Sequence, residues 1–178
     1  MDYQSIIDKY YPADDELRRI LITHSRAVAD RALAIADCHP EMHIDRQFLE
    51  EAAMLHDIGV FRTDAPGICC TGTEPYIRHG VIGADIMRAE GFPQHARVCE
   101  RHTGAGISLN EIEAQSLPLP HHDFLPETME EKLICYADKF YSKSHLERVR
   151  TVEQAAKSLE KFGKDGAARF MEWAKMFE

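Results

Sequence analysis

Apolar residues recur at helical spacing along most of the chain. The clearest case is residues 15–37, where the positions three and four apart are Leu17, Ile20, Leu21, His24, Ala27, Val28, Arg31 and Ile35. This spacing places the side chains on one face of an amphipathic helix, and Asp14 or Asp15 is expected to cap its first turn. No segment alternates strictly enough between apolar and polar residues to demand a strand, so we predict an all-α fold.

The same periodicity predicts six further helices, most of them bounded by glycine, proline or an aspartate cap. They cover residues 46–57, 77–90, 93–102, 127–143, 151–162 and 165–177. Asp45 is expected to cap the first of these helices, and Gly163 separates the last two. The stretches 58–76 and 105–126 are rich in proline and glycine, and we expect them to be mostly irregular. Long loops in a compact domain are often functional.

The length and composition are typical of one compact domain, covering residues 1–178. With 44% hydrophobic residues in 178 positions, the chain can bury a sizeable core. No stretch approaches the roughly 20 apolar residues of a membrane span, and the first residues lack the pattern of a secretory signal. We therefore expect a cytoplasmic protein without membrane contact. The residues expected to pack the last helix onto the domain, with a homodimer contact as the alternative, are Phe170, Met171, Trp173, Met176 and Phe177.

The charge of the chain narrows the classes of binding partner. A formal net charge of -9 repels a phosphate backbone at long range, which disfavours a broad nucleic-acid surface. A small phosphorylated molecule is still compatible with this charge, because a bound cation reverses the potential around it.

Histidine and aspartate side chains interrupt the apolar faces of several predicted helices. The inward-facing donors are His24, His56, Asp57, His79, His102 and Asp138. Taken singly, each histidine is more often a hydrogen-bonded core residue than a metal ligand. A carboxylate such as Asp138, however, is costly to bury without a partner. One or two shared divalent cations would satisfy all six groups together. Imidazole and carboxylate donors without thiolate suit Mn, Fe, Zn, Ni or Co.

These residues resemble the signature of a known family. His24, the tetrapeptide His56-Asp57-Ile58-Gly59 and Asp138 are similar to the H…HD…D pattern of the HD-domain metal-dependent phosphohydrolases. The additional His79 and His102 are similar to the H…HD…H…H…D subset that holds two ions.

The resemblance implies a fold and a ligand assignment. It implies a helical bundle whose metal-site core covers about 15–143, with the helices of 151–177 packing on it. It further implies that one ion is bound by His24, His56, Asp57 and Asp138, and that Asp57 bridges to a second ion bound with His79 and His102.

One departure from the family pattern concerns phosphate binding. Many family members carry a lysine shortly after the HDIG tetrapeptide, whereas Val60 and Phe61 occupy that turn in this chain. The bases next to a predicted ligand or in a loop beside one are Arg62, Arg78, Arg101 and Lys139. We expect Asp57, Arg78, Arg101 and Lys139 to act in catalysis, the three bases by contacting phosphate. Lys139 is the favoured phosphate contact because it directly follows a predicted ligand.

The resemblance implies hydrolysis of a small phosphorylated molecule, most naturally a nucleotide, by a metal-bound hydroxide. Two alternatives stay open. The same donor set resembles that of the HD-fold di-iron oxygenases, which cleave carbon–carbon or carbon–phosphorus bonds. A non-catalytic module that binds a nucleotide and signals to a partner is the other alternative, although no donor of the constellation is missing.

Overall fold

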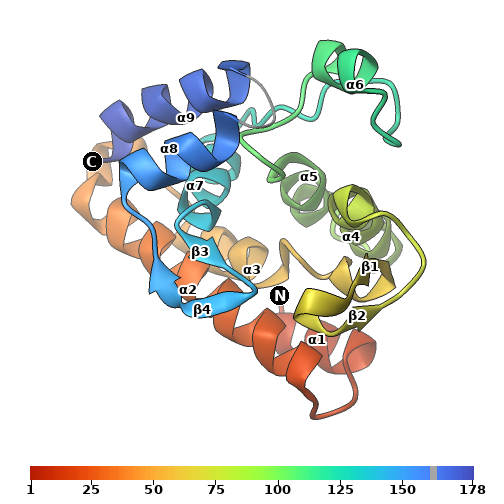
Figure 1. The fold of residues 1–178 in the computed structure, drawn as a ribbon. Coiled ribbons are helices and arrows are strands. Elements are labelled where there is room, and N and C mark those ends of the chain that lie inside the picture. The colour runs from red at the N-terminus through yellow and green to blue at the C-terminus, as the bar shows by residue number, and fades with distance from the viewer. Residues whose placement is uncertain (161–163) are drawn as a thin grey trace.

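Helices dominate the computed structural model, which describes residues 1–160 and 164–178 (Figure 1). The α-helices of these residues are α1 (Tyr3–Tyr10), α2 (Glu16–Cys38), α3 (Arg46–Leu55), α4 (His79–Ala89), α5 (Pro93–Arg101), α6 (Leu109–Gln115), α7 (Met129–Asp138), α8 (Val152–Glu160) and α9 (Lys164–Phe177). Short 3₁₀ helices are η1 (Pro40–Met42), η2 (Val60–Arg62), η3 (Pro66–Ile68) and η4 (Tyr76–Arg78). The predicted all-α class is confirmed.

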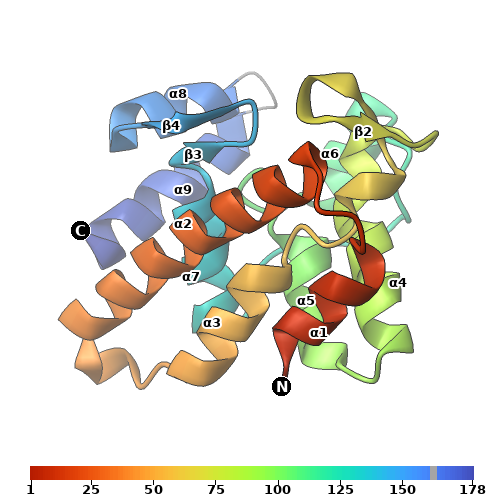
Figure 2. The ribbon, with the colours of Figure 1, turned by 90° about the horizontal axis from the view of Figure 1, so that it is seen from below.

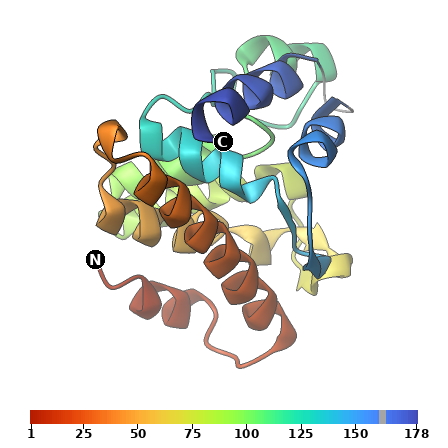
Figure 3. The same ribbon diagram turned by 90° about the vertical axis from the view of Figure 1, so that its left-hand side faces the viewer.

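The strands of the described residues form two short antiparallel hairpins. Strand β1 (Asp64–Ala65) pairs with β2 (Cys70–Thr71), and β3 (Tyr141–Ser142) pairs with β4 (His145–Val149). Figures 2 and 3 show both hairpins on the same side of the molecule, whereas α1 and α9 lie on opposite sides of the bundle.

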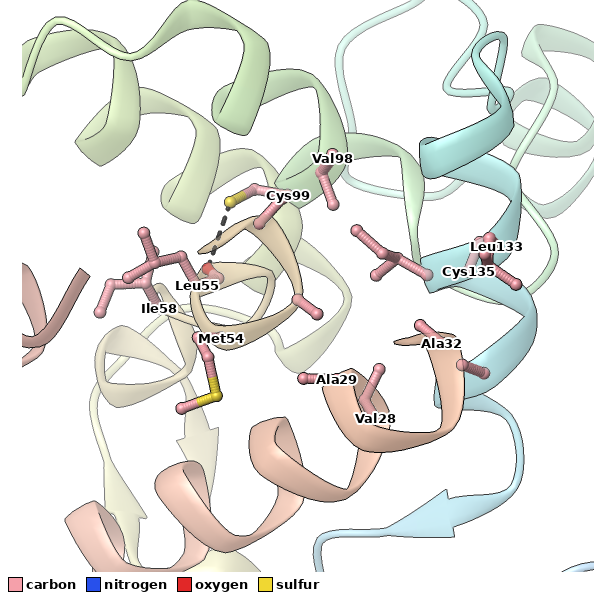
Figure 4. Packing of buried hydrophobic residues seen from close by; sticks show 14 of the residues in the cluster. Val28, Ala29, Ala32, Met54, Leu55, Ile58, Val98, Cys99, Leu133 and Cys135 are labelled. Carbon is pink, nitrogen blue, oxygen red and sulfur yellow. Dashed lines mark hydrogen bonds between the residues drawn. The ribbon is translucent and has the colours of Figure 1, made fainter. Parts of the chain in front are cut away.

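The core forms where α2 packs against α3 and α7, and α5 packs against the same two helices (Figure 4). Small side chains of α2, among them Ala29 and Ala32, are fully buried and allow the neighbouring helices to approach closely. The Cys99 thiol of α5 donates to the Leu55 carbonyl of α3 over 3.4 Å. Helix α4 in turn packs along α5. The apolar face predicted for residues 15–37, which form α2, therefore lies at the centre of the fold.

The predicted caps are present at the first two long helices. Asp15 accepts a hydrogen bond from the Arg18 amide at 2.9 Å, and Asp45 accepts one from the Phe48 amide at 3.0 Å. Each side chain satisfies an amide that has no partner within its helix. The predicted separation of the last two helices by Gly163 falls outside the described residues.

Three elements differ from the sequence prediction. The helix predicted over 127–143 ends at Asp138, and residues 141–149 form the β3–β4 hairpin instead. Helix α1 was not predicted, because its eight residues contribute only Ile6 and Ile7 to the core. Helix α6 lies within the segment expected to be mostly irregular, where Ser108 and Glu111 form a capping box.

The C-terminal helix packs through three of the five residues expected to do so. Phe170, Trp173 and Phe177 of α9 are buried against the core, whereas the expectation is wrong for Met171 and Met176, which point away from the core and are 39% and 41% exposed. The alternative of a homodimer contact stays a prediction. Within the described residues, no helix combines the length and apolar character that a membrane crossing requires.

Gly59 lies where the chain after α3 passes against the first turns of α4. A Cβ atom at this position would lie 2.4 Å from both the Gly83 amide nitrogen and the His79 carbonyl oxygen. Gly59 has a right-handed conformation, with φ -86° and ψ -5°, so backbone freedom is not what the position requires. The absence of a side chain lets two backbone segments touch, and this contact fixes α4 relative to the end of α3.

We expect Gly59→Ala to lower the free energy of unfolding by about 2 kcal/mol or more, because backbone atoms on both sides would have to shift. Urea denaturation followed by circular dichroism measures this change. Gly67→Ala is the matched control, since no described residue other than its chain neighbours places an atom within 4 Å of the added Cβ, and it should change stability by less than about 0.5 kcal/mol. Equal stability of the two variants would contradict the close-contact explanation.

Candidate metal centre

Five segments bring the six predicted donors to one point in the interior. His24 lies in the middle of α2, and the other donors lie at or beside helix ends. Their side chains are almost completely buried, and the residues are His24, His56, Asp57, His79, His102 and Asp138. One ligand atom from each residue fits within 4.8 Å of the others in two groups, one of His24, His56, Asp57 and Asp138, the other of Asp57, His79 and His102.

Asp57 is the residue that both groups share. Its Oδ2 lies 3.2 Å from Nε2 of His24 and 3.1 Å from Nε2 of His56. Its Oδ1 lies 3.5 Å from Nε2 of His79 and 3.3 Å from Nε2 of His102. Each carboxylate oxygen therefore faces one pair of imidazoles, which is the arrangement of a carboxylate that can bridge two cations.

The histidines at helix ends are held by the last turn of the helix that precedes them. His56 follows α3, His79 follows η4 and His102 follows α5, each as the C-terminal cap. In each ring Nδ1 lies 2.6–2.7 Å from the carbonyl oxygen of the residue three positions earlier. A carbonyl can only accept, so Nδ1 carries a proton, and Nε2 points into the site, where its lone pair can bind a cation whenever the ring is neutral.

These donors fit a divalent cation and do not satisfy one another. Nε2 of His79 lies 3.0 Å from Nε2 of His102, although neither atom can donate when both rings are neutral and protonated on Nδ1. Among the described residues, Oδ1 of Asp57, Nε2 of His56 and both ring nitrogens of His24 are buried without a hydrogen-bond partner. Converging lone pairs of this kind are costly in a protein interior unless a cation accepts them.

Two lysines offset the charge of the buried carboxylates. Lys139 Nζ lies 2.5 Å from Asp138 Oδ2, and Lys143 Nζ lies 2.5 Å from Asp57 Oδ2. Although burial opposes ionisation, the nearby cationic groups hold the pKa of both carboxyl groups well below its usual range. Burial favours neutral His56, but Asp57 and Asp138 outweigh it and raise its pKa to about 9. Both carboxylates are therefore ionised and available as ligands, and the lysine ammonium groups act as their counter-charges.

A pocket of about 610 Å³ opens over this centre. The donors and bases that line it are His79, His102, Asp138, Lys139, Lys143 and Arg150. The donor groups therefore lie at the wall of a cavity large enough for a small organic molecule.

The predicted phosphate-binding bases are divided between the pocket and the surface. Lys139 lines the pocket, and its contact with phosphate stays a prediction. Arg78 instead binds Glu74 at 2.9 Å, and Arg101 binds Glu127 at 2.6 Å. Neither arginine is among the described residues that line the cavity, so their contact with phosphate stays a prediction.

Lys143 is a residue of the site that was not predicted. Residue 143 was expected in the last turn of a helix, whereas the structure places Lys143 in the turn between β3 and β4 with its ammonium group at Asp57. Ser142 and Ser144 on either side are the signal that was available, because serine favours turns over helix interiors.

Comparison with known proteins identifies the family of this chain and several proteins of similar sequence. Residues 21–142 match the HD domain family. A tRNA (cytidine(56)-2'-O)-methyltransferase of Picrophilus torridus is 35% identical over 156 residues, covering 82% of this chain and 40% of that protein. One of Thermoplasma volcanium is 37% identical over 123 residues, covering 68% and 32%. An uncharacterized protein of Methanocaldococcus jannaschii is 39% identical over 121 residues, covering 66% and 64%. The chain thus spans less than two thirds of each relative.

The fold is similar to that of a solved structure. The HD domain of the phosphodiesterase PgpH from L. monocytogenes aligns with a TM-score of 0.53 at 17% identity, covering 96% of this chain and 85% of that one. At this identity the likeness concerns the arrangement of the helices.

We expect the two donor groups to lose cations independently. His79→Ala should reduce the manganese bound per chain from two ions to one, His24→Ala should do the same at the other group, and Asp57→Ala should remove both. Elemental analysis after equilibrium dialysis against Mn²⁺ measures the ratio. His95→Gln is the control, because His95 is a buried histidine beside Glu51, outside both groups. Full occupancy in the Asp57→Ala protein would rule out a bridging carboxylate.

Proposed function

The chain belongs to the HD domain family, and from this premise we propose that it is a metal-dependent phosphohydrolase acting on a small phosphorylated molecule, most naturally a nucleotide. The observation that carries the proposal is the position of Asp57, whose two oxygens face two pairs of imidazole nitrogens beside a pocket. A site built in this way can hold two cations close to a substrate in the cavity.

Divalent transition metals at such a site lower the pKa of coordinated water and polarise phosphoryl oxygens. The donor set suits Mn, Fe, Co, Ni or Zn. His24, His56 and Asp138 would hold one ion, and His79 and His102 the other, with Asp57 common to both. Lys139 projects into the pocket beside Asp138, where its ammonium group would offset negative charge that grows on the phosphoryl oxygens.

The pocket walls support a nucleotide as the substrate. The cavity volume of about 610 Å³ is much larger than a phosphate group needs. Tyr76 is 39% exposed at the pocket, and its ring stacks on His79 at a centroid distance of 4.7 Å. A ring held flat in this way offers a face on which a nucleobase can stack. Ile77 and Leu159 add apolar surface to the walls.

The relatives described as tRNA methyltransferases fit this proposal when their lengths are considered. The alignment with the Picrophilus protein covers 82% of this chain, so it includes most of residues 21–142, yet it covers only 40% of that relative. We assign methyl transfer to the remainder of those proteins and hydrolysis to the shared segment. Their connection with tRNA supports a nucleotide, or the end of a nucleotide chain, as the molecule bound.

The proposal is tested by measuring phosphate release from nucleoside phosphates and from glycerol phosphate after loading with each of the five metals. We expect turnover of a nucleotide, reduced at least about 100-fold in His56→Ala and Asp57→Asn, because loss of even an outer partner of a metal ligand costs about 10–100-fold. His95→Gln should retain the wild-type rate.

Three outcomes would contradict the proposal. Oxygen consumption with iron as the sole competent metal would favour the di-iron oxygenase. Tight nucleotide binding without turnover would favour a binding module. Absence of phosphate release with every metal would exclude hydrolysis of the compounds tested.

A further inference from the structure

Figure 1 shows the β3–β4 hairpin. Lys143 lies in the turn of this hairpin, and its ammonium group reaches the metal centre. Its side chain is only 11% exposed, and Nζ lies 2.5 Å from Oδ2 of Asp57. The same Nζ lies 5.9 Å from the centre of the Tyr76 ring, at the pocket wall. An ammonium group this close to a carboxylate oxygen forms a buried ion pair with it.

The ammonium group contacts the carboxylate oxygen that faces the first group of metal donors. Oδ2 of Asp57 is the atom that lies 3.1–3.2 Å from Nε2 of His56 and His24. Lys143 therefore approaches the very oxygen atom that a metal ion of this group would have to share. Two cations at one buried oxygen repel each other strongly, because the surroundings screen their charges poorly.

The backbone of the hairpin is held in place, whereas the side chain of Lys143 can rotate. The Arg150 amide donates to the Phe140 carbonyl at 2.8 Å, and its guanidinium donates to the Lys139 carbonyl at 3.0 Å. These bonds tie the start of the hairpin to its end. Lys143 itself lies in the turn and lines the pocket. Its ammonium group is attached through four flexible methylene groups. Rotation of these methylene groups away from Asp57 would therefore keep the ammonium in the space that a substrate occupies.

We propose that Lys143 is both the internal counter-cation of Asp57 in the metal-free protein and a phosphate-binding residue of the metal-loaded protein. The ammonium group of Lys143 would leave Asp57 when a metal ion is bound there, and it would then bind an anionic oxygen of the substrate. The second half of this proposal rests on the proposed function, whereas the first half depends only on the contact with Asp57. The ammonium group of Lys143 thus pairs with the Asp57 carboxylate in the metal-free protein and with a substrate phosphate in the metal-loaded protein.

The first half is tested by metal affinity in the absence of any phosphate. Competition with a chromophoric chelator gives the Mn²⁺ affinity of wild type, Lys143→Met, Lys143→Arg and Arg148→Met. We expect Lys143→Met to bind Mn²⁺ about tenfold more tightly, because a competing cation is gone. Arg148→Met removes an exposed charge of the same hairpin and should change the affinity less than about twofold. Equal or weaker binding by Lys143→Met would overturn the counter-cation role.

The second half is tested by calorimetric titration of inorganic phosphate into the manganese-saturated proteins. Loss of a charge-assisted hydrogen bond should weaken phosphate binding to Lys143→Met by about tenfold or more. Lys143→Arg keeps the charge and should stay within about threefold of wild type. Unchanged phosphate affinity in Lys143→Met would overturn the phosphate-binding role.

The Mn²⁺ competition and the phosphate titration distinguish this proposal from the proposed function, because neither experiment requires turnover. If the wild-type protein were inactive but Lys143→Met changed both affinities as expected, the two roles of Lys143 would be supported and the hydrolase assignment would fail. Circular dichroism of each metal-free variant verifies the fold, and Lys143→Gln replaces Lys143→Met if the methionine variant is unfolded. Loss of structure in both neutral variants with retention in Lys143→Arg would support the counter-cation role, since it would show that buried Asp57 requires a positive charge.

Discussion

A buried carboxylate surrounded by imidazole lone pairs is the constraint on which this structure depends. Asp57 is completely buried, and the nitrogens around it come from His24, His56, His79 and His102. None of the three helix-end histidines can donate from Nε2 in its neutral form, so hydrogen bonds among these groups cannot satisfy them. Positive charge must be supplied, by a lysine, a proton or a metal ion. The helices, the close-packed turn and the pocket are arranged around that requirement.

Helix ends provide a simple way to place imidazoles accurately. The last carbonyl groups of a helix have no amide partner within it, and a histidine at the C-terminal cap can donate to one of them from Nδ1. The same contact repeats at His56, His79 and His102. One hydrogen bond thus satisfies an unpaired carbonyl, selects the tautomer and directs Nε2 to the centre. Gly59 completes the arrangement by letting the turn after His56 touch α4.

The sequence predicted the donors better than the bases around them. His24 and Asp138 lie on apolar helix faces, so helical periodicity alone indicated their direction. Arg78 and Arg101 precede ligands in sequence, but neighbouring residues of a helix point about 100° apart, and both arginines turn to surface carboxylates. Lys143 was missed because its position depends on a hairpin whose first strand has two residues, too few for an alternating pattern.

The spread of the donors over five segments has a consequence for the lifetime of the protein. Residues as far apart in sequence as His24 and Asp138 meet only in the native fold, so the unfolded chain offers no comparable site. A ligand that binds only the native state adds its binding free energy to the stability, by about 2.7 kcal/mol at a hundred times its dissociation constant. Proteases degrade the unfolded fraction, so cellular abundance of the protein should rise and fall with the supply of the metal.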